Sequence, residues 1–202
     1  MSDFNTATIK AAIPGLAAHL EENAAFLNEA DAKLGDGDLG VTMQRGARGL
    51  LEIVDDLPDD LGMVFMRCAQ AFTKTSGSSY GTLLATGLMT AAKACKGRES
   101  VPWSKVPALL GDAQAAMMVR GKGALGEKTV LDTLEAARLA AKGLDDPEAL
   151  LAAALTATEK TLDRLRDEPA RQGRARMFAE KSVGLDDPGM LAFRCLLEGL
   201  KG

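Results

Sequence analysis

Aromatic residues are rare in this sequence and make up only 4% of its 202 residues. It also contains no sustained alternation of β-branched and polar residues, which is the pattern typical of strands. Alanine, leucine and methionine supply most of the apolar content, and unbranched side chains lose little rotamer freedom in a helix. We therefore expect an all-α fold, with the 47% of hydrophobic residues sufficient for a buried core.

Cysteine and histidine are also scarce. The three cysteines, Cys68, Cys95 and Cys195, are far apart and form no C-x-x-C pair, so we expect small buried hydrophobic residues rather than disulfides or a cysteine metal centre. His19 is the only histidine, and we expect it to be a packed or surface residue. A single histidine in the middle of a predicted helix, far from the acidic stretch 31–40, argues against Ser-His-Asp catalysis, Cys-His catalysis, a phosphohistidine relay and a histidine-bound zinc ion.

An excess of positive charge and long apolar runs are both absent. The net charge of −4 and pI of about 5.2 provide no basic surface for nucleic acid or an anionic membrane. No apolar run approaches the roughly 18 residues of a membrane-spanning helix. Residues 1–5 lack the basic and apolar regions of a secretory signal, so we expect a cytoplasmic protein without membrane or nucleic-acid partners.

Apolar residues at helical spacing, interrupted by glycine, proline and aspartate, predict eight helices. The segment 80–96 is almost wholly apolar, and we expect it to be the central helix. Asp146-Pro147 and Asp187-Pro188 have the cap-then-proline order that starts a helix. The sequence predicts an antiparallel eight-helix bundle or barrel in one domain (1–202), with helices over about 6–29, 40–54, 60–72, 80–96, 103–119, 128–142, 147–166 and 188–200.

Polar residues and glycines are concentrated in four breaks, at 31–40, 73–81, 121–129 and 173–189. Short connections in a helical bundle do not need so many special residues. These breaks follow the first, third, fifth and seventh predicted helices. In an up-and-down bundle the four breaks would meet at one end, where we expect a binding site.

The break 31–40 contains Asp31, Asp36 and Asp38 with glycines between them. Carboxylate oxygens suit Mg²⁺, which usually shares its coordination shell with phosphates. An EF-hand is excluded, because a loop starting at Asp36 would have Ala47 at its twelfth position in place of glutamate. The alternative interpretation is that these aspartates cap helices in a solvated turn.

The other breaks contain groups suited to phosphate. Ser76 and Gly77 precede a helix N-terminus, where free N–H groups bind anions, although a simple serine cap explains them equally well. The run 126–129 is not a P-loop, because Glu127 separates glycine from lysine and no strand precedes it. In the last break Arg174 suits phosphate or base stacking, and a solvated helix face is its alternative interpretation.

Taken in order, the breaks spell a distinctive series of motifs across nearly the whole chain. They are Asp-x4-Asp-Gly-Asp-x-Gly, Ser-Gly-x-x-Tyr-Gly-Thr, Gly-Glu-Lys-Thr-x-x-Asp, Gly-Arg-Ala and Ser-Val-Gly-x-x-Asp-Pro-Gly. This series closely resembles the L subunit (DhaL), or nucleotide-binding domain, of dihydroxyacetone kinases.

The resemblance implies a barrel of eight antiparallel helices that binds ADP or ATP with two Mg²⁺ ions at one end. It implies a separate K subunit that holds a small ketose covalently on a histidine. The nucleotide is either exchangeable ATP or a captive ADP recharged by a phosphotransfer-system protein. The implied catalytic and metal-binding residues are Asp31, Asp36 and Asp38, and the implied nucleotide contacts are Ser76, Gly77, Thr129, Val130, Arg174, Asp187 and Pro188.

The sequence departs from the family pattern beside the expected phosphates. Leu39 replaces a usual histidine, Thr42 a frequent asparagine, and Thr73 with Lys74 two usual glycines. We include Thr42 and Lys74 among the expected nucleotide contacts. The departures leave open another substrate, such as erythrulose. Two further alternatives are a nucleotide-loaded regulatory binding module and a helical scaffold with an acidic loop.

Overall fold

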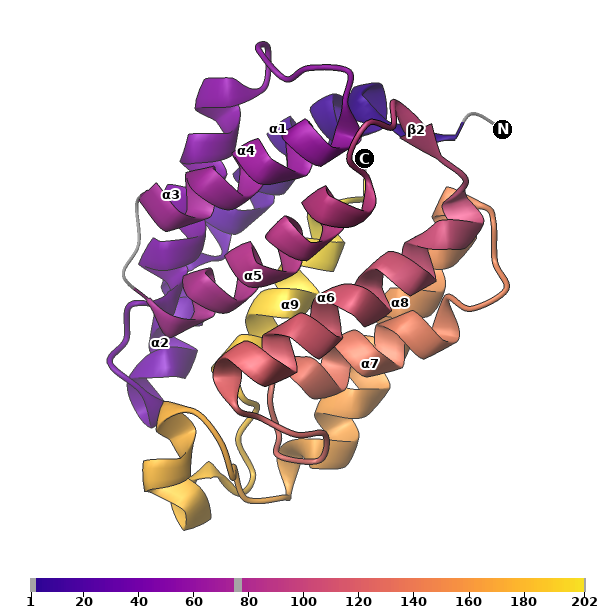
Figure 1. The fold of residues 1–202 in the computed structure, drawn as a ribbon. Helices are drawn as coiled ribbons and strands as arrows, with labels where there is room; N and C mark the ends of the chain where they lie inside the picture. Colours follow the sequence, from indigo (N-terminus) through magenta and orange to yellow (C-terminus); the bar gives the residue numbers. More distant parts are fainter. Residues whose placement is uncertain (1–2, 75–77, 202) are drawn as a thin grey trace.

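The computed structural model describes residues 3–74 and 78–201, and these are mostly helical, as expected (Figure 1). A two-residue antiparallel ribbon pairs Phe4 with Val101. In chain order the elements of the described residues are β1 (Phe4–Asn5), α1 (Thr6–Glu22), α2 (Ala24–Leu34), α3 (Leu39–Ile53), α4 (Leu61–Lys74), α5 (Ser79–Ala94), β2 (Ser100–Val101), the 3₁₀ helix η1 (Trp103–Lys105), α6 (Val106–Gly121), α7 (Val130–Ala140), α8 (Pro147–Arg166), the 3₁₀ helix η2 (Arg174–Ser182) and α9 (Pro188–Glu198).

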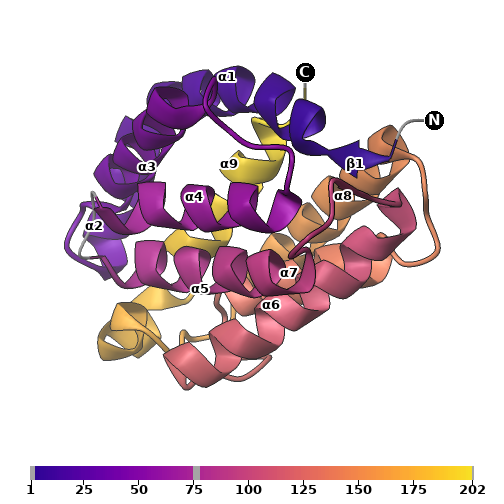
Figure 2. The ribbon, with the colours of Figure 1, turned by 45° about the horizontal axis from the view of Figure 1, so that its top comes forward.

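The last helix, α9, lies at the centre of the molecule. It contacts α1, α2, α3, α7 and α8, and Figure 2 shows it between the helices that surround it. Met190 and Cys195 of α9 are fully buried in the largest apolar cluster, together with residues of α1, α3, α4 and α8. None of the described helices has the length and apolar character needed to cross a membrane.

The prediction that 80–96 forms the central helix is wrong. Helix α5 packs between α4 and α6, and Met89 on it is 42% exposed. The residues that α5 buries are small, among them Gly81, Ala85 and Ala92, whereas Leu88 is only partly buried. An almost wholly apolar sequence therefore does not place this helix at the centre. Its small residues are buried against the neighbouring helices, while larger residues such as Met89 are partly exposed.

The first predicted helix, 6–29, is two helices that meet at Asn23. The Asn23 side chain donates a hydrogen bond of 2.9 Å to the His19 carbonyl, and such local side-chain bonds compete with the helical ladder. The chain then continues as α2 beyond the expected end at residue 29, because Leu27 and Leu34 extend the buried face. Asp31 therefore lies on a helix rather than in the loop where we expected it.

The junction of α2 and α3 depends on a close backbone contact. A Cβ atom on Gly40 would overlap the Ala24 carbonyl group and lie 2.8 Å from Asn28 Oδ1. That oxygen accepts a 3.2 Å hydrogen bond from the Val41 N–H at the start of α3. Glycine at position 40 therefore lets α3 begin directly against α2.

The start of α9 was predicted correctly from Asp187-Pro188. The Asp187 side chain accepts a 2.9 Å hydrogen bond from the Met190 N–H, and Pro188 occupies the first helical position. Burial raises the pKa of the Asp187 carboxyl to about 7, although backbone N–H groups and Lys128 act in the opposite direction. The central helix thus begins at a carboxyl group that is costly to ionise.

We expect Gly40→Ala to lower the free energy of unfolding by about 1–3 kcal/mol, because the new methyl group separates α2 from α3. Gly15→Ala is the matched control. Gly15 lies in α1, and a Cβ there meets only the Gly199 carbonyl at an ordinary 3.6 Å. The control should be neutral or stabilise by up to about 1 kcal/mol. Urea unfolding measures both, and equal effects would contradict the close contact.

We expect Asp187→Asn to change how stability depends on pH. The wild-type carboxyl has a folded pKa above its unfolded value, so its stabilising contribution is complete below about pH 4 and is lost as pH rises towards 7. Asparagine keeps an oxygen for the Met190 N–H but does not ionise. Between these two pKa values, the wild-type stability minus that of the variant should fall by about 1.4 kcal/mol for each step of one in pH. Parallel stability profiles from pH 4 to 8 would refute the raised pKa.

Candidate nucleotide and metal site

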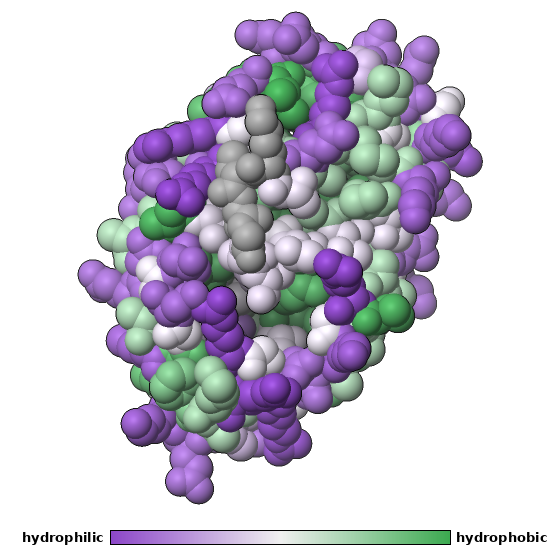
Figure 3. Space-filling view, turned by 60° about the vertical axis from the view of Figure 1, so that its left-hand side comes forward, coloured by the Kyte–Doolittle hydropathy of each residue, from purple (hydrophilic) through white to green (hydrophobic). Residues whose placement is uncertain are grey.

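The described parts of the four polar breaks meet at one end of the molecule, as the up-and-down arrangement predicts, and contribute to the lining of a cavity of about 790 Å³. This volume is in the range of pockets for small ligands and cofactors. Figure 3 shows the hollowed surface on this side, with hydrophilic residues around it. The lining comes from the α2–α3 junction, the start of α5, the α6–α7 loop, residues 172–177 and the start of α9.

Three aspartates form one wall of this cavity, and we call them the aspartate cluster: Asp31, Asp36 and Asp38. Each offers a carboxylate oxygen within 4.8 Å of the others. Asp31 projects from the last turn of α2, and the other two come from the following loop, where Gly37 adopts a φ of 77°. Positive φ is the conformation that glycine adopts without strain.

The aspartate cluster contains both a helix cap and free carboxylates. Asp31 Oδ2 accepts hydrogen bonds from the N–H groups of Asp38 (3.0 Å) and Leu39 (3.3 Å), at the start of α3. Asp38 occupies the N-cap position but makes no capping bond with its own side chain. Capping therefore accounts for Asp31 alone. Three like charges this close favour a cation, and an all-oxygen donor set suits Mg²⁺.

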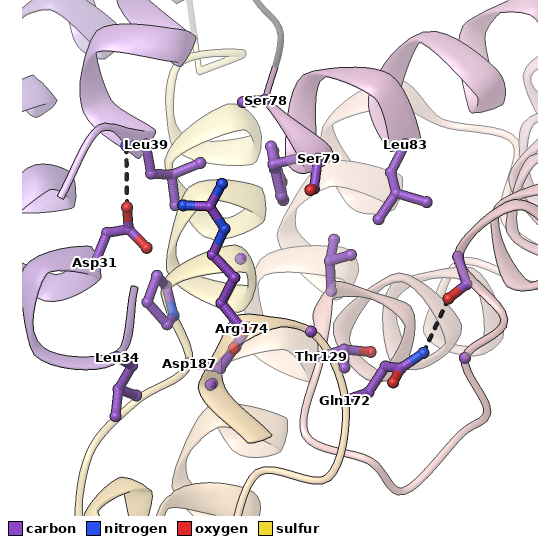
Figure 4. A pocket seen from close by; sticks show the side chains of 18 of the residues that line it. Asp31, Leu34, Leu39, Ser78, Ser79, Leu83, Thr129, Gln172, Arg174 and Asp187 are labelled. Carbon is purple, nitrogen blue, oxygen red and sulfur yellow. Dashed lines mark hydrogen bonds between the residues drawn. The ribbon is translucent and has the colours of Figure 1, made fainter. Parts of the chain in front are cut away.

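Arg174 extends into the cavity between Asp31 and Ser79 (Figure 4), and it forms an ion pair with Asp36. Arg174 is the first residue of η2, and its side chain is half exposed, so it is accessible from the cavity. A guanidinium group can bind two oxygens of a phosphate at once. The structure thus brings the predicted arginine next to the predicted metal ligands.

The wall opposite the aspartate cluster is apolar. Leu83, Met117, Val130 and Leu131 line it and belong to a second buried cluster of the protein. A cavity with carboxylates at one side and aliphatic side chains at the other can hold a ligand with a charged end and a flat apolar end. Leu83 and Met117 were not predicted as lining residues, because at helical spacing they are indistinguishable from core residues.

Thr129 and Val130 begin α7 at the edge of the cavity. The Thr129 hydroxyl accepts a 3.2 Å hydrogen bond from the Leu131 N–H, and the Asp132 carboxylate accepts one of 2.9 Å from the Thr129 N–H. These bonds form a capping box. The hydroxyl keeps its O–H as a donor for a ligand. Lys128 points away from the cavity, which agrees with the exclusion of a P-loop.

The remaining expected contacts are placed differently. Asp187 and Pro188 line the cavity beside Arg174. Thr42 does not line it, because its side chain faces the interior from α3 and is only 4% exposed. Ser76 and Gly77 lie outside the described residues, and only the backbone of Lys74, the last residue of α4, is described. Nearby, Ser78 caps α5 through a 3.0 Å bond from the Gly81 N–H.

A second group of potential ligands, unforeseen in the sequence, lies away from this cavity. His19, Cys195 and Glu198 offer atoms within 4.8 Å of one another. Glu198 is already close to Arg194, at 3.5 Å, and burial raises the pKa of the Cys195 thiol to about 11. Both features disfavour a bound cation there. All three cysteines are buried free thiols, as expected.

Comparison with known proteins agrees with these observations. The family model for the DAK2 domain matches residues 33–202. The ADP-binding subunit DhaL of the PEP-dependent dihydroxyacetone kinase of Escherichia coli is 28% identical over 181 residues, which cover 87% of this chain and 86% of that protein. The L-erythrulose 1-kinase of Mycolicibacterium smegmatis is 30% identical over 185 residues, covering 89% of this chain and 32% of that protein.

The fold is also found in solved structures. The native dihydroxyacetone kinase of C. freundii superimposes with a TM-score of 0.75 at 25% identity, over 96% of this chain and 34% of that one. The same kinase with AMP-PNP and Mg²⁺ superimposes at 0.76, with 24% identity, over 99% of this chain and 34% of that one. The chain thus spans about a third of these larger kinases and most of the stand-alone DhaL subunit. The resemblance first seen in the four motifs is confirmed, and the chain belongs to the DAK2 domain family.

Proposed function

We propose that this chain is the nucleotide-binding subunit of a dihydroxyacetone-type kinase and presents a phosphoryl group of ATP, or of recharged ADP, to a small ketose held by a separate K subunit. One observation carries the proposal. The aspartate cluster and Arg174 lie at one side of a 790 Å³ cavity whose other side is aliphatic. The ADP-binding subunit of E. coli, which the chain matches over most of its length, supports it.

In this proposal, Asp31, Asp36 and Asp38 hold two Mg²⁺ ions. When bound, the ions would neutralise negative charge that develops on the phosphoryl group during transfer. Arg174 leaves Asp36 to bind a phosphate, while Thr129 donates its hydroxyl and the aliphatic wall receives the base. The start of α9, at Asp187 and Pro188, closes the cavity. The protein itself positions groups and supplies charge, so it needs no cysteine or histidine nucleophile.

We further propose that the chain is one cytoplasmic domain over 1–202 and corresponds to the eight-helix barrel of the family. The described residues form nine α-helices. Counting α1 and α2 as one helix broken at Asn23 gives the eight of the family pattern. The open end with the cavity would dock on the K subunit, and a phosphotransfer-system protein is the proposed donor if ADP stays bound. Ser76, Gly77 and Lys74 remain proposed nucleotide contacts, whereas Thr42, which faces the interior, is no longer one of them.

A second substrate is erythrulose, which the 30% identity to an L-erythrulose 1-kinase favours. Leu39, where the family pattern has histidine, removes a hydrogen-bond donor beside the expected phosphates. A nucleotide-loaded regulatory module is a different class of function, in which binding occurs without turnover. Assays with the partner subunit separate these possibilities.

We expect the purified chain to bind ADP in Mg²⁺ and to lose this binding in EDTA. Asp38→Ala should weaken it at least tenfold, because a metal ligand that caps no helix is removed. Asp112→Ala, an exposed carboxylate on α6 outside the cavity, is the control and should bind like the wild type. Calorimetry measures the three proteins. If the wild type binds ADP equally well in EDTA, the metal assignment is wrong.

We expect the chain alone to leave ketoses unphosphorylated and the chain with a K-type subunit to transfer phosphate to them. The assay supplies either ATP or a phosphorylated phosphotransfer protein with bound ADP, and compares dihydroxyacetone with erythrulose. Product formation is measured by ³¹P NMR. Magnesium-dependent ADP binding without transfer from either donor to any short ketose would leave the regulatory module as the function.

A further inference from the structure

Lys128 is the most unusual charged residue of the described chain. Its side chain is only 1% exposed. Its ammonium nitrogen lies 2.8 Å from each of three backbone carbonyl oxygens, those of Arg166, Glu168 and Ser182. Three acceptors need three N–H donors, which only the charged ammonium form provides. We call this arrangement the lysine clasp.

The lysine clasp joins the two ends of one segment. Arg166 is the last residue of α8, Glu168 follows it, and Ser182 is the last residue of η2. Between these ends, residues 172–177 line the cavity, and among them is Arg174. A single buried charge therefore holds both ends of the segment 167–182, which carries the arginine of the site.

Other contacts also hold this segment: the Gly184 N–H donates a 2.9 Å hydrogen bond to the Arg166 carbonyl, the Arg171 N–H donates to the Glu127 carbonyl, and Arg166 pairs with Asp186 at 2.9 Å. On one side, Ala170 and Ala175 pack against Leu34 at the end of α2. On the other side, the Gln172 side-chain amide donates 2.9 Å hydrogen bonds to the carbonyls of Gly121 and Lys122. These bonds are exposed to solvent and hold the middle of the segment. The Arg166–Asp186 pair is partly exposed, whereas the lysine clasp is a fully buried charged contact that reaches both ends of the segment.

Lys128 has an unfavourable backbone conformation, which indicates that the three hydrogen bonds of its side chain hold it in place. Its φ is 61°, in the left-handed region that costs a non-glycine residue about 1–2 kcal/mol. Such conformations persist where the surrounding structure determines them. Burial also lowers the pKa of the Lys128 ammonium, while the carboxylates of Asp187, Asp186 and Asp167 oppose that change. The cost of burying the charge is thus offset by full hydrogen bonding.

We infer that Lys128 is a positioning residue of the nucleotide site: it contacts no ligand itself, and by fixing both ends of 167–182 it holds Arg174 over the aspartate cluster. This inference rests on the proposed function for its ligand, Mg²⁺–ADP, but the clasp itself does not. It gives a role to the lysine of the 126–129 motif that differs from the phosphate contact of a P-loop lysine.

A double-mutant cycle on the binding of Mg²⁺–ADP tests the inference. Arg174→Ala and Lys128→Met should each raise the dissociation constant about tenfold, the size expected for one charge-assisted hydrogen bond. The double variant should be little worse than either single variant, because Arg174 is already displaced once the clasp is lost. Independent effects would multiply to about 100-fold, and that result would overturn the inference.

The control is Leu61→Ala, which creates a cavity in a separate apolar cluster with Cys95 and Val101. Leu61→Ala should lower stability without changing the affinity for Mg²⁺–ADP. The double variant of Leu61→Ala and Arg174→Ala should have the same dissociation constant as Arg174→Ala alone. All affinities are measured at a temperature where circular dichroism shows every variant folded. A loss of affinity in Leu61→Ala equal to that in Lys128→Met would mean that Lys128 acts through global stability.

If Lys128→Met does not fold, Ser182→Ala replaces it in the cycle. The Ser182 hydroxyl accepts a 2.7 Å hydrogen bond from the Ala170 N–H and donates to the Ala179 carbonyl, so its loss loosens the same segment more mildly. It should weaken binding in the same direction and be non-additive with Arg174→Ala. Full additivity of this pair would also contradict the inference.

Limited proteolysis in the absence of nucleotide tests the lysine clasp independently of the proposed function. Trypsin should cut after Arg171, Arg174 and Arg176 faster in Lys128→Met than in Leu61→Ala, because only the former releases the segment. Unchanged cleavage would refute the clasp even if ADP binds. A second outcome is faster cleavage of Lys128→Met together with no binding of Mg²⁺–ADP by the wild type. That result would refute the proposed function and the positioning role of Lys128, but it would support the lysine clasp.

Discussion

The site depends on polar side chains placed at helix ends of opposite partial charge, a basic one at C-terminal ends and acidic ones at N-terminal ends. The Lys128 ammonium binds carbonyls at the C-terminal end of α8 and of η2, where the helix dipole is negative. Carboxylates occupy the N-terminal ends, Asp187 at α9 and Asp132 at α7. These side chains satisfy backbone groups that would otherwise lack hydrogen-bond partners near an open cavity. The loops that form the site are therefore held by electrostatics as well as by apolar packing.

The carboxylates around the cavity form two groups: those that cap a helix and those that are available to a ligand. Asp187, Asp132 and Asp31 each accept backbone N–H bonds at a helix start. Asp36 and Asp38 cap nothing and extend into the cavity, where Arg174 is the counter-charge. The two interpretations of the acidic loop, helix cap and metal ligand, thus hold for different residues. One loop both leads into α3 and presents two carboxylates to the cavity, one of which, Asp36, pairs with Arg174.

Short sequence motifs predicted where helices begin, whereas the arrangement of the helices depended on tertiary contacts. Asp146-Pro147 and Asp187-Pro188 fixed the starts of α8 and α9, because cap and proline act within one turn. The meeting of the four breaks followed from the alternating direction of successive helices. The break at Asn23, the peripheral place of α5 and the apolar wall of the cavity were not predictable, because each depends on which helix packs against which. The direction of Lys128 depends on carbonyls 38 to 54 residues away.

The chemistry of the cavity also bears on the proposed division of labour between this chain and a K subunit. Among the described lining residues are carboxylates, arginines, hydroxyls and aliphatic side chains, without an imidazole or a thiol. Burial raises the pKa of Asp187, but that carboxyl is committed to the cap of α9. The site can therefore gather charge around phosphates more readily than it can accept a proton from a sugar hydroxyl. In the proposed function, the base for the acceptor hydroxyl would come from the K subunit that holds the ketose.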